Sequence, residues 1–326
     1  MNPLPAQGLG ALDIALLVTA AAFGAIWGSF LNVCIARIPR GMSVVSPPSH
    51  CFACGSRVRA RDNIPILSYF LLRGRCRDCG AKFSARHALV EALTAALSVL
   101  VLWTFALDVP GVPLGVRVAR FSVYFAFAAV LLALTFIDLD TKRLPDVITL
   151  PSVAVFFLGG FAIGEVAWLE RAIGAVAGYA FVRLIADIYY YSTGREGLGL
   201  GDGKLLAVMG ALLGWKALPA IVCAASCVGI LVSVPVLVVQ RRRRTKAAAP
   251  APAGPQASPA TSEPAPDAAV PGGQDDAAGP AQAGATPVSI RRAEVPFGPF
   301  LSASALAYLF LHRQAWAFLE RVLLGG

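Results

Sequence analysis

Two acidic residues lie at the ends of strongly apolar segments, where a carboxylate is costly. Asp138 ends the run Leu-Thr-Phe-Ile-Asp, and Asp202 directly follows Gly199-Leu-Gly201. An acid inside a bilayer costs about 2.5–3.5 kcal/mol on insertion scales, so it needs a partner or a function. Two carboxylates held together share a proton, and one then acts as general base on water while the other acts as general acid. The pattern favours aspartic-protease chemistry at Asp138 and Asp202, with Gly199 and Gly201 letting an extended substrate backbone approach.

These two acids, and two acids near them in the sequence, could have structural roles instead of catalytic ones. Asp202 could cap the helix that follows it, and Asp138 could pair with Lys204. Asp146 is most simply a helix cap, and Asp140 most simply a solvated loop charge. Pairs of acids in membranes also serve ion or proton pathways, so a transporter is a second interpretation of the dyad.

Four cysteines form two matching Cys-x2-Cys-Gly units, Cys51 with Cys54 and Cys76 with Cys79, separated by 21 residues. Two thiolates on one tight turn reach the same metal, and two such turns complete a tetrahedron, as in zinc ribbons. Four thiolates leave no coordination position open, so a zinc ion here would be structural. Disulfides and unligated thiols are the alternatives, and a cytoplasmic location disfavours stable disulfides.

The segments that carry these residues are apolar enough to lie in a membrane. Hydrophobic residues make up 57% of the 326 residues and charged residues 14%, against about 25% charged residues in soluble proteins. This composition excludes an ordinary soluble domain. A helical span needs about 20 mostly apolar residues. The sequence predicts an all-α polytopic membrane protein with about eight transmembrane helices, at 11–35, 88–107, 117–138, 147–164, 168–191, 204–215, 217–239 and 298–318.

Basic residues gather on one side of these predicted spans. Ten lie between Arg37 and His87, and another cluster occupies Arg241 to Arg244. Because Lys and Arg beside spans mark the cytoplasmic side, both clusters and both dyad acids are placed there, with both termini outside. The excess of 28 basic over 19 acidic residues therefore reflects the orientation of the protein in the membrane. No nucleic-acid partner is expected, because no motif that contacts nucleic-acid bases accompanies the basic residues.

Together these observations predict five regions. The four-cysteine region is a small zinc-ribbon-like cytoplasmic domain between helices 1 and 2, and the Ala/Pro-rich region cannot bury a core and should be a disordered cytoplasmic linker. The regions are 1–35 (first transmembrane helix), 36–87 (four-cysteine domain), 88–240 (transmembrane catalytic core), 241–296 (linker) and 297–326 (last transmembrane helix and tail).

Six motifs, in this order, resemble those of the bacterial type IV prepilin peptidases, which are membrane aspartic proteases of the GxGD group. The resemblance covers nearly the whole chain except 245–290. The motifs are Gly28-Ser-Phe-Leu-Asn32-Val, the paired cysteine units, Arg86 to Glu91, Ile137-Asp138 through Leu144-Pro145-Asp146, Gly199-Leu-Gly201-Asp202, and Pro296-Phe-Gly-Pro-Phe300.

The resemblance implies that Asp138 and Asp202 are the catalytic acids of an inner-membrane endopeptidase. Such enzymes remove the basic leader of prepilin or pseudopilin precursors after a glycine, at the cytoplasmic face, for pilus assembly or type II secretion. Members with the cysteine domain typically also methylate the new N-terminal amine with S-adenosylmethionine. No nucleotide-type glycine fingerprint indicates where that donor binds. The alternatives are a non-enzymatic pilus or secretion scaffold, and a proton- or cation-coupled transporter that uses the two acids.

Overall fold

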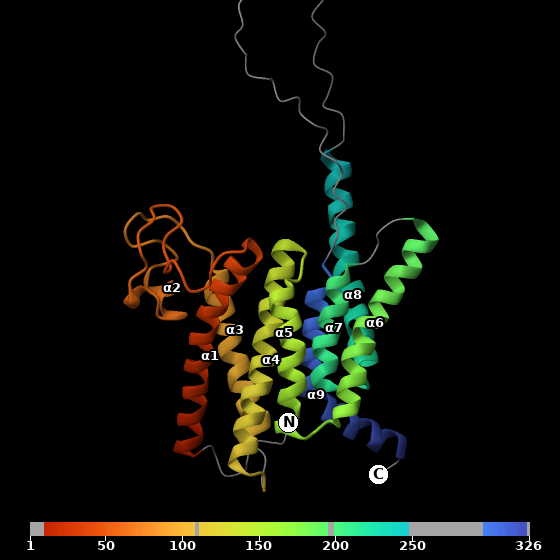
Figure 1. The fold of residues 1–326 in the computed structure, drawn as a ribbon. Helices are drawn as coiled ribbons and strands as arrows, with labels where there is room; N and C mark the ends of the chain where they lie inside the picture. Colours follow the sequence, from red (N-terminus) through yellow and green to blue (C-terminus); the bar gives the residue numbers. More distant parts are fainter. Residues whose placement is uncertain (1–9, 108–110, 195–198, 248–295, 325–326) are drawn as a thin grey trace, which may run out of the picture. The chain divides into compact units, whose positions relative to one another are not determined.

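The computed structural model describes residues 10–107, 111–194, 199–247 and 296–324. Within these ranges the long elements are all helices, and the only β-pairing is two isolated bridges, which confirms the all-α prediction. Each predicted span coincides with one helix (Figure 1). The helices are α1 (Ala11–Arg37), α3 (Arg86–Leu102), α4 (Leu114–Thr141), α5 (Asp146–Ile163), α6 (Trp168–Thr193), α7 (Leu200–Leu213), α8 (Ala217–Ala247) and α9 (Gly298–Leu324).

Six of these helices, α1, α3, α4, α5, α6 and α8, are long and apolar enough to cross a membrane. The protein is thus a multi-pass membrane protein. α7 has 14 residues and a length of about 21 Å, less than the hydrocarbon thickness of about 30 Å. α7 is therefore too short to cross a bilayer alone, although its segment was predicted as a span. The apolar part of α9, Gly298–His312, is also shorter than a full span.

The chain divides into two compact units, one formed by Met1–Ile230 with Pro296–Gly326 and the other by Leu231–Val295. Of the second unit, the structure describes only the end of α8, which continues to Ala247 rather than ending near 239 as predicted. The rest of the predicted linker, 248–295, lies outside the described residues.

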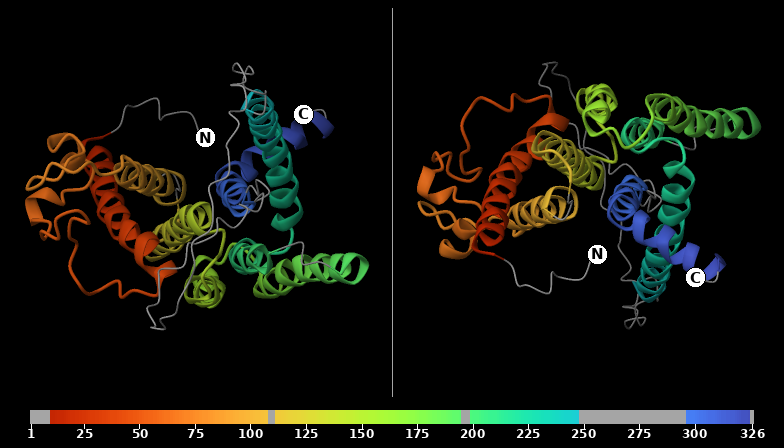
Figure 2. Two further views of the ribbon diagram at one scale, coloured as in Figure 1. Left: turned by 90° about the horizontal axis from the view of Figure 1, so that it is seen from above. Right: turned by 90° about the horizontal axis from the view of Figure 1, so that it is seen from below.

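Within the first unit, α7 packs against α5, α6 and α9, while α4 contacts α1, α3, α5 and α9. Figure 2 shows α7 beside α6 and α9 beside α4. Glycines permit the closest approach: a Cβ atom on Gly210 of α7 would lie 2.2 Å from the backbone oxygen of Gly174 of α6. Gly28 of α1 likewise lies against the backbone of Glu91 in α3, where a Cβ atom would come within 2.6 Å of Glu91 Cα. Small residues let helices approach this closely in membranes.

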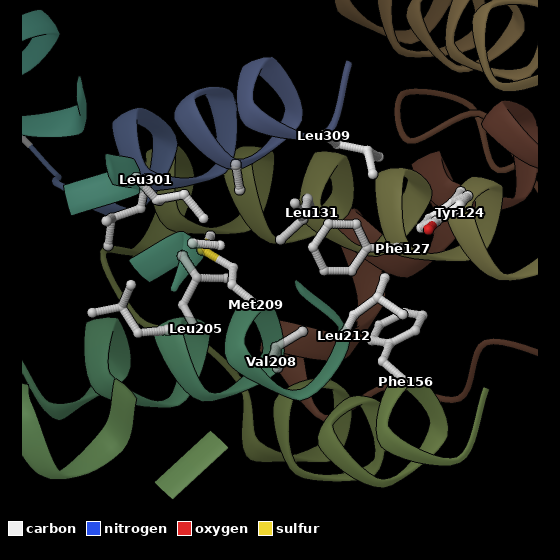
Figure 3. Close-up of a cluster of buried hydrophobic side chains, with 14 of the residues drawn as sticks. Tyr124, Phe127, Leu131, Phe156, Leu205, Val208, Met209, Leu212, Leu301 and Leu309 are labelled. Carbon is white, nitrogen blue, oxygen red and sulfur yellow. The ribbon is translucent and has the colours of Figure 1, made fainter. Parts of the chain in front are cut away.

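Side chains of α7 and of the helices around it fill the core (Figure 3). Leu205, Val208 and Met209 of α7 are almost completely buried, with exposed fractions of 1% or less. They meet aromatic and aliphatic side chains of α4, α5 and α9, among them Phe127 and Phe156, whose rings are 5.2 Å apart in an edge-to-face arrangement. α7 is therefore a buried helix, which fixes its first turn relative to the end of α4.

Candidate active site at the ends of α4 and α7

Asp138 lies one turn before the end of α4, where the helix stops because Lys142 adopts a left-handed conformation, φ +53°. The backbone N–H of Lys142 donates to the carbonyl of Asp138 at 2.8 Å. The Asp138 side chain is buried, with 6% exposed, and its Oδ2 has no hydrogen-bond partner among the described residues. A buried carboxylate oxygen without a partner is rare in proteins and marks a candidate functional group.

Asp202 is the third residue of α7, in its first turn, and is partly buried. The helix begins after Gly199, which occupies the N-cap position with no side-chain hydrogen bond, so Asp202 is not the cap that the alternative interpretation assigned to it. The Asp202 carboxyl group lies close enough to Asp138 for the two charges to interact. The structure thus brings together the two acids of the predicted dyad.

The two glycines before Asp202 differ in their surroundings. A Cβ atom on Gly199 would meet no described atom within 4 Å, whereas one on Gly201 would lie 3.3 Å from Leu144 Cδ1. Among the described residues, none therefore crowds the Cβ side of Gly199, whereas Gly201 lets the loop between α4 and α5 pack on α7.

The neighbouring acids are occupied by basic partners. Lys204 pairs with Asp146 at the start of α5, and not with Asp138 as the alternative interpretation had it. Asp146 follows the N-cap residue, Pro145, and so acts as the partner of Lys204 rather than as the cap. Asp140 accepts a hydrogen bond of 2.6 Å from Arg86 Nη1 of α3, so it is not a free loop charge.

These ion pairs join α3 to α4 and α5 to α7 next to the dyad. Neither Asp138 nor Asp202 pairs with a basic residue in the described part of the chain. The charge nearest to each that is left to influence it is therefore the other acid.

Gly298, the first residue of α9, completes the surroundings of Asp138, and sequence reasoning gave it no role. Its backbone N–H faces the Asp138 carboxyl group, and a Cβ atom there would lie only 2.5 Å from Asp138 Oδ2. A side chain at this position would displace the Asp138 carboxyl group or the start of α9. The available signal was its place in the motif Pro296-Phe-Gly-Pro-Phe300, which could not indicate what the glycine touches.

The four cysteines between α1 and α3 form a second candidate site. The Sγ atoms of Cys51, Cys54, Cys76 and Cys79 all lie within 4.8 Å of one another, and those of Cys51 and Cys79 are 3.8 Å apart. A tetrahedral zinc ion with Zn–S bonds of about 2.3 Å requires sulfur separations of about 3.8 Å. The four thiols fit a metal ion in this way.

The two cysteine units have the same backbone geometry. The N–H of the glycine after each unit donates to the carbonyl of its first cysteine, Gly55 to Cys51 at 2.8 Å and Gly80 to Cys76 at 2.9 Å. Both glycines have positive φ, +72° and +71°, which other residues rarely adopt. This explains the Cys-x2-Cys-Gly spacing.

Neighbouring groups favour the metal-binding form of one thiol. Hydrogen bonds with Ser56 lower the pKa of Cys54 to about 6, and the thiolate is the form that binds metals. Elsewhere in the domain, hydrogen bonds from Arg77 lower the pKa of Asp62, and the two side chains form a bidentate ion pair. This pair ties the turn at Asp62 to the second cysteine unit.

Fold and site together define a class: multi-pass helical membrane proteins with an interacting carboxylate pair at helix ends, a class that includes the intramembrane aspartic proteases. Comparison with known proteins narrows the class. Residues 22–105 match the family model of the bacterial peptidase A24 N-terminal domain, and residues 125–234 match that of the type IV leader peptidase family.

Three relatives, like others that the chain matches, are named prepilin leader peptidase/N-methyltransferase. That of Aeromonas hydrophila is 39% identical over 257 residues, 72% of this chain and 84% of the relative. Those of Neisseria gonorrhoeae and Burkholderia pseudomallei (strain 1026b) are both 36% identical, covering 68% and 77% of this chain and 83% and 85% of the relatives. No solved structure matches the chain. The chain belongs to the prepilin leader peptidase/N-methyltransferase family.

Proposed function

We propose that this protein is a membrane aspartic endopeptidase that removes the basic leader of prepilin or pseudopilin precursors after a glycine, and that it then methylates the new N-terminal amine. Membership of the family supports both activities. The single observation that carries the protease assignment is the interaction of Asp138 with Asp202 at the adjoining ends of α4 and α7.

The proposed mechanism follows from the surroundings of the two acids. Neither has a described basic partner, so mutual repulsion disfavours a doubly ionised pair and favours one shared proton. The ionised carboxylate accepts a proton from water as the oxygen attacks the peptide carbonyl, and the protonated one donates to the carbonyl oxygen. The two acids titrate as a coupled pair, so the role of general base is not assigned to either residue.

The precursor is proposed to reach the dyad from the side of Gly199, where no described atom would lie within 4 Å of an added Cβ atom. This side is proposed to be cytoplasmic because the ten basic residues between Arg37 and His87 adjoin the same helix ends. The bacterial inner membrane is the proposed location. A positively charged domain gives no attraction to a basic leader, so anionic lipid headgroups are the proposed counter-charge.

Two cofactors accompany this proposal. Cys51, Cys54, Cys76 and Cys79 would hold a zinc ion, which would cross-link a domain too small to fold on its own core. The methyl donor would be S-adenosylmethionine, as the names of the relatives suggest. No described residue is assigned to that donor.

The test is cleavage of a prepilin-like precursor by membranes that carry Asp138→Asn or Asp202→Asn. Each variant should lose at least about 10³-fold in cleavage rate, as expected when one member of a catalytic unit is removed. Asp140→Asn is the matched control, because Asp140 lies on the same helix end but pairs with Arg86. Mass spectrometry of the product reports the cut position and a methyl increment of about 14 Da.

The alternatives predict other outcomes. A scaffold would tolerate both substitutions, and a transporter would lose ion-coupled uptake instead of cleavage. Wild-type cleavage by either folded variant would refute the dyad.

A further inference from the structure

The short helix α2 (Leu67–Leu71), in the four-cysteine domain, exposes an apolar face that no described part of the chain covers. Leu67, Phe70 and Leu71, at positions i, i+3 and i+4, are 59%, 68% and 73% exposed, and Ile64 just before the helix is 43% exposed. The opposite face is turned inward: Ser68 is buried and the Tyr69 ring packs on Phe83, with centroids 5.7 Å apart. Soluble surfaces rarely expose a contiguous apolar group of this kind.

The residue before α2 is hydrogen-bonded to α3, which itself packs closely on α1. The backbone N–H of Ile66 donates to Glu91 Oε2 of α3 at 2.6 Å. Glu91 in turn lies against α1, where a Cβ atom on Gly28 would be 2.6 Å from Glu91 Cα. The start of α2 therefore has a defined depth relative to the spans.

The backbone at Ile66 shows how tightly this position is held. Ile66 has φ +63° and ψ −54°, and the N–H of Leu67 donates to the carbonyl of Pro65 at 2.6 Å, which makes a γ-turn. Such a turn is strained for a β-branched residue. The hydrogen bond to Glu91 holds the chain in this conformation, so the location of α2 is specified rather than incidental.

The depth of this contact matches the interfacial layer of a bilayer. Glu91 lies five residues into α3, which begins at Arg86, or about 7.5 Å below the helix end. Interfacial helices bury their apolar faces about 5–10 Å into the boundary between headgroups and acyl chains. Figure 1 shows α2 beside the upper parts of α1 and α3.

Charge complements this placement. Arg73 and Arg75 follow α2 directly and both are exposed. Each basic residue near an anionic membrane surface contributes about 1 kcal/mol of attraction. An exposed apolar face followed by exposed arginines is a combination that a membrane surface with anionic phosphates accommodates.

We propose that residues 64–75 form a membrane-interface anchor, in which Ile64, Leu67, Phe70 and Leu71 insert among the lipid acyl chains and Arg73 and Arg75 contact lipid phosphates. The anchor fixes the four-cysteine domain on the bilayer surface beside α1 and α3. This inference does not depend on the proposed enzymatic activity.

The test uses the full-length protein reconstituted in phosphatidylethanolamine and phosphatidylglycerol bilayers that contain phosphatidylcholine brominated near the glycerol end of its acyl chains. Phe70→Trp adds an indole at the centre of the proposed anchor. Its added fluorescence, relative to wild type, should be lost in brominated bilayers. Phe52→Trp is the matched control, because Phe52 is an aromatic residue of the same domain with 89% exposure but lies outside α2.

Quenching of Phe70→Trp no stronger than that of Phe52→Trp would overturn the proposal and leave the apolar face to a protein partner. A second measurement needs no variant. Wild-type protein in bilayers with a phospholipid carrying a photoreactive acyl chain should become labelled in the peptide that contains residues 64–71. Labelling confined to the membrane helices would also overturn the proposal.

Discussion

At the scale of single residues, the same side-chain type has different roles within a few positions. Asp138 and Asp140 are both at the end of α4, but residues two apart on a helix point in directions about 200° apart. Asp138 consequently faces the bundle and Asp202, whereas Asp140 faces Arg86, whose guanidinium also lies 4.9 Å from the Phe136 ring. The helix geometry therefore points the candidate catalytic acid and the structural acid in different directions.

Gly298 supplies a prediction at this scale. In Gly298→Ala, the new methyl group would lie 2.5 Å from Asp138 Oδ2, so the carboxyl group or α9 must move. A displacement of about 1 Å at a reacting group can cost about 10²-fold in rate. We expect precursor cleavage to fall by about 10- to 100-fold, measured as kcat/KM in detergent, with little change in thermal stability.

Gly229→Ala is the matched control for this change. A Cβ atom there would touch Phe300, near the start of α9, at an ordinary 3.5 Å, and no atom of Asp138 lies among its nearest neighbours. It should cleave like wild type. Equal activities of Gly298→Ala and wild type would show that the contact does not position the acid.

These residues also show what the sequence reveals about the site. The acids and cysteines were predictable because a carboxylate at a membrane edge and paired Cys-x2-Cys units are unusual in themselves. The pairing of Lys204 with Asp146, and the contact of Gly298 with Asp138, were not. Both depend on which helix ends meet, and a single sequence does not give that information.

At the scale of elements, α7 is the part that positions Asp202, and its position depends on α6. Gly203, one residue beyond Asp202, is buried against α6, where a Cβ atom would lie 3.2 Å from Val182 Cβ. Further along, Gly210 meets the backbone of Gly174. The existence of α7 was predictable from its apolar run, but its burial was not, because an apolar segment of this length fits several arrangements.

The crossing of α6 and α7 can be tested at Gly210. Gly210→Val places a branched side chain where a single Cβ atom would already lie 2.2 Å from the Gly174 oxygen. Overpacking of this kind typically costs about 1–3 kcal/mol. We expect a lower unfolding temperature in detergent and reduced cleavage, because the shift of α7 moves Asp202.

The control for this prediction is Gly115→Ala in α4, where an added Cβ atom meets no described atom within 4 Å. Because alanine is a better helix former than glycine by about 1 kcal/mol, this variant should be at least as stable as wild type. An unchanged unfolding temperature for Gly210→Val would contradict the close crossing.

At the scale of the whole molecule, the four-cysteine domain and the membrane helices are joined by few but specific contacts. Ile66 binds Glu91 within α3, and Arg86, at the start of α3, binds Asp140 beside the dyad. The same helix thus supports the domain and lies next to the candidate active site. A single sequence does not predict these connections, because they depend on how the helix ends and the domain pack together.

The proposed metal site of the domain gives a prediction for the intact protein. Residues between α1 and α3 form only one α-helix, α2, of five residues, and a region of this size usually needs a metal or disulfide cross-link to fold. A closed four-thiolate site implies about one zinc ion per chain. Cys76→Ser should therefore lower the zinc content of the purified full-length protein. It should also unfold the domain, so that trypsin cleaves after the arginines of 37–87 while the membrane helices stay protected. Cys223→Ser, at an exposed cysteine of α8, should change neither. Wild-type protein that is active, reduced and free of zinc would refute the metal site, and trypsin resistance of Cys76→Ser would show that the domain folds without it.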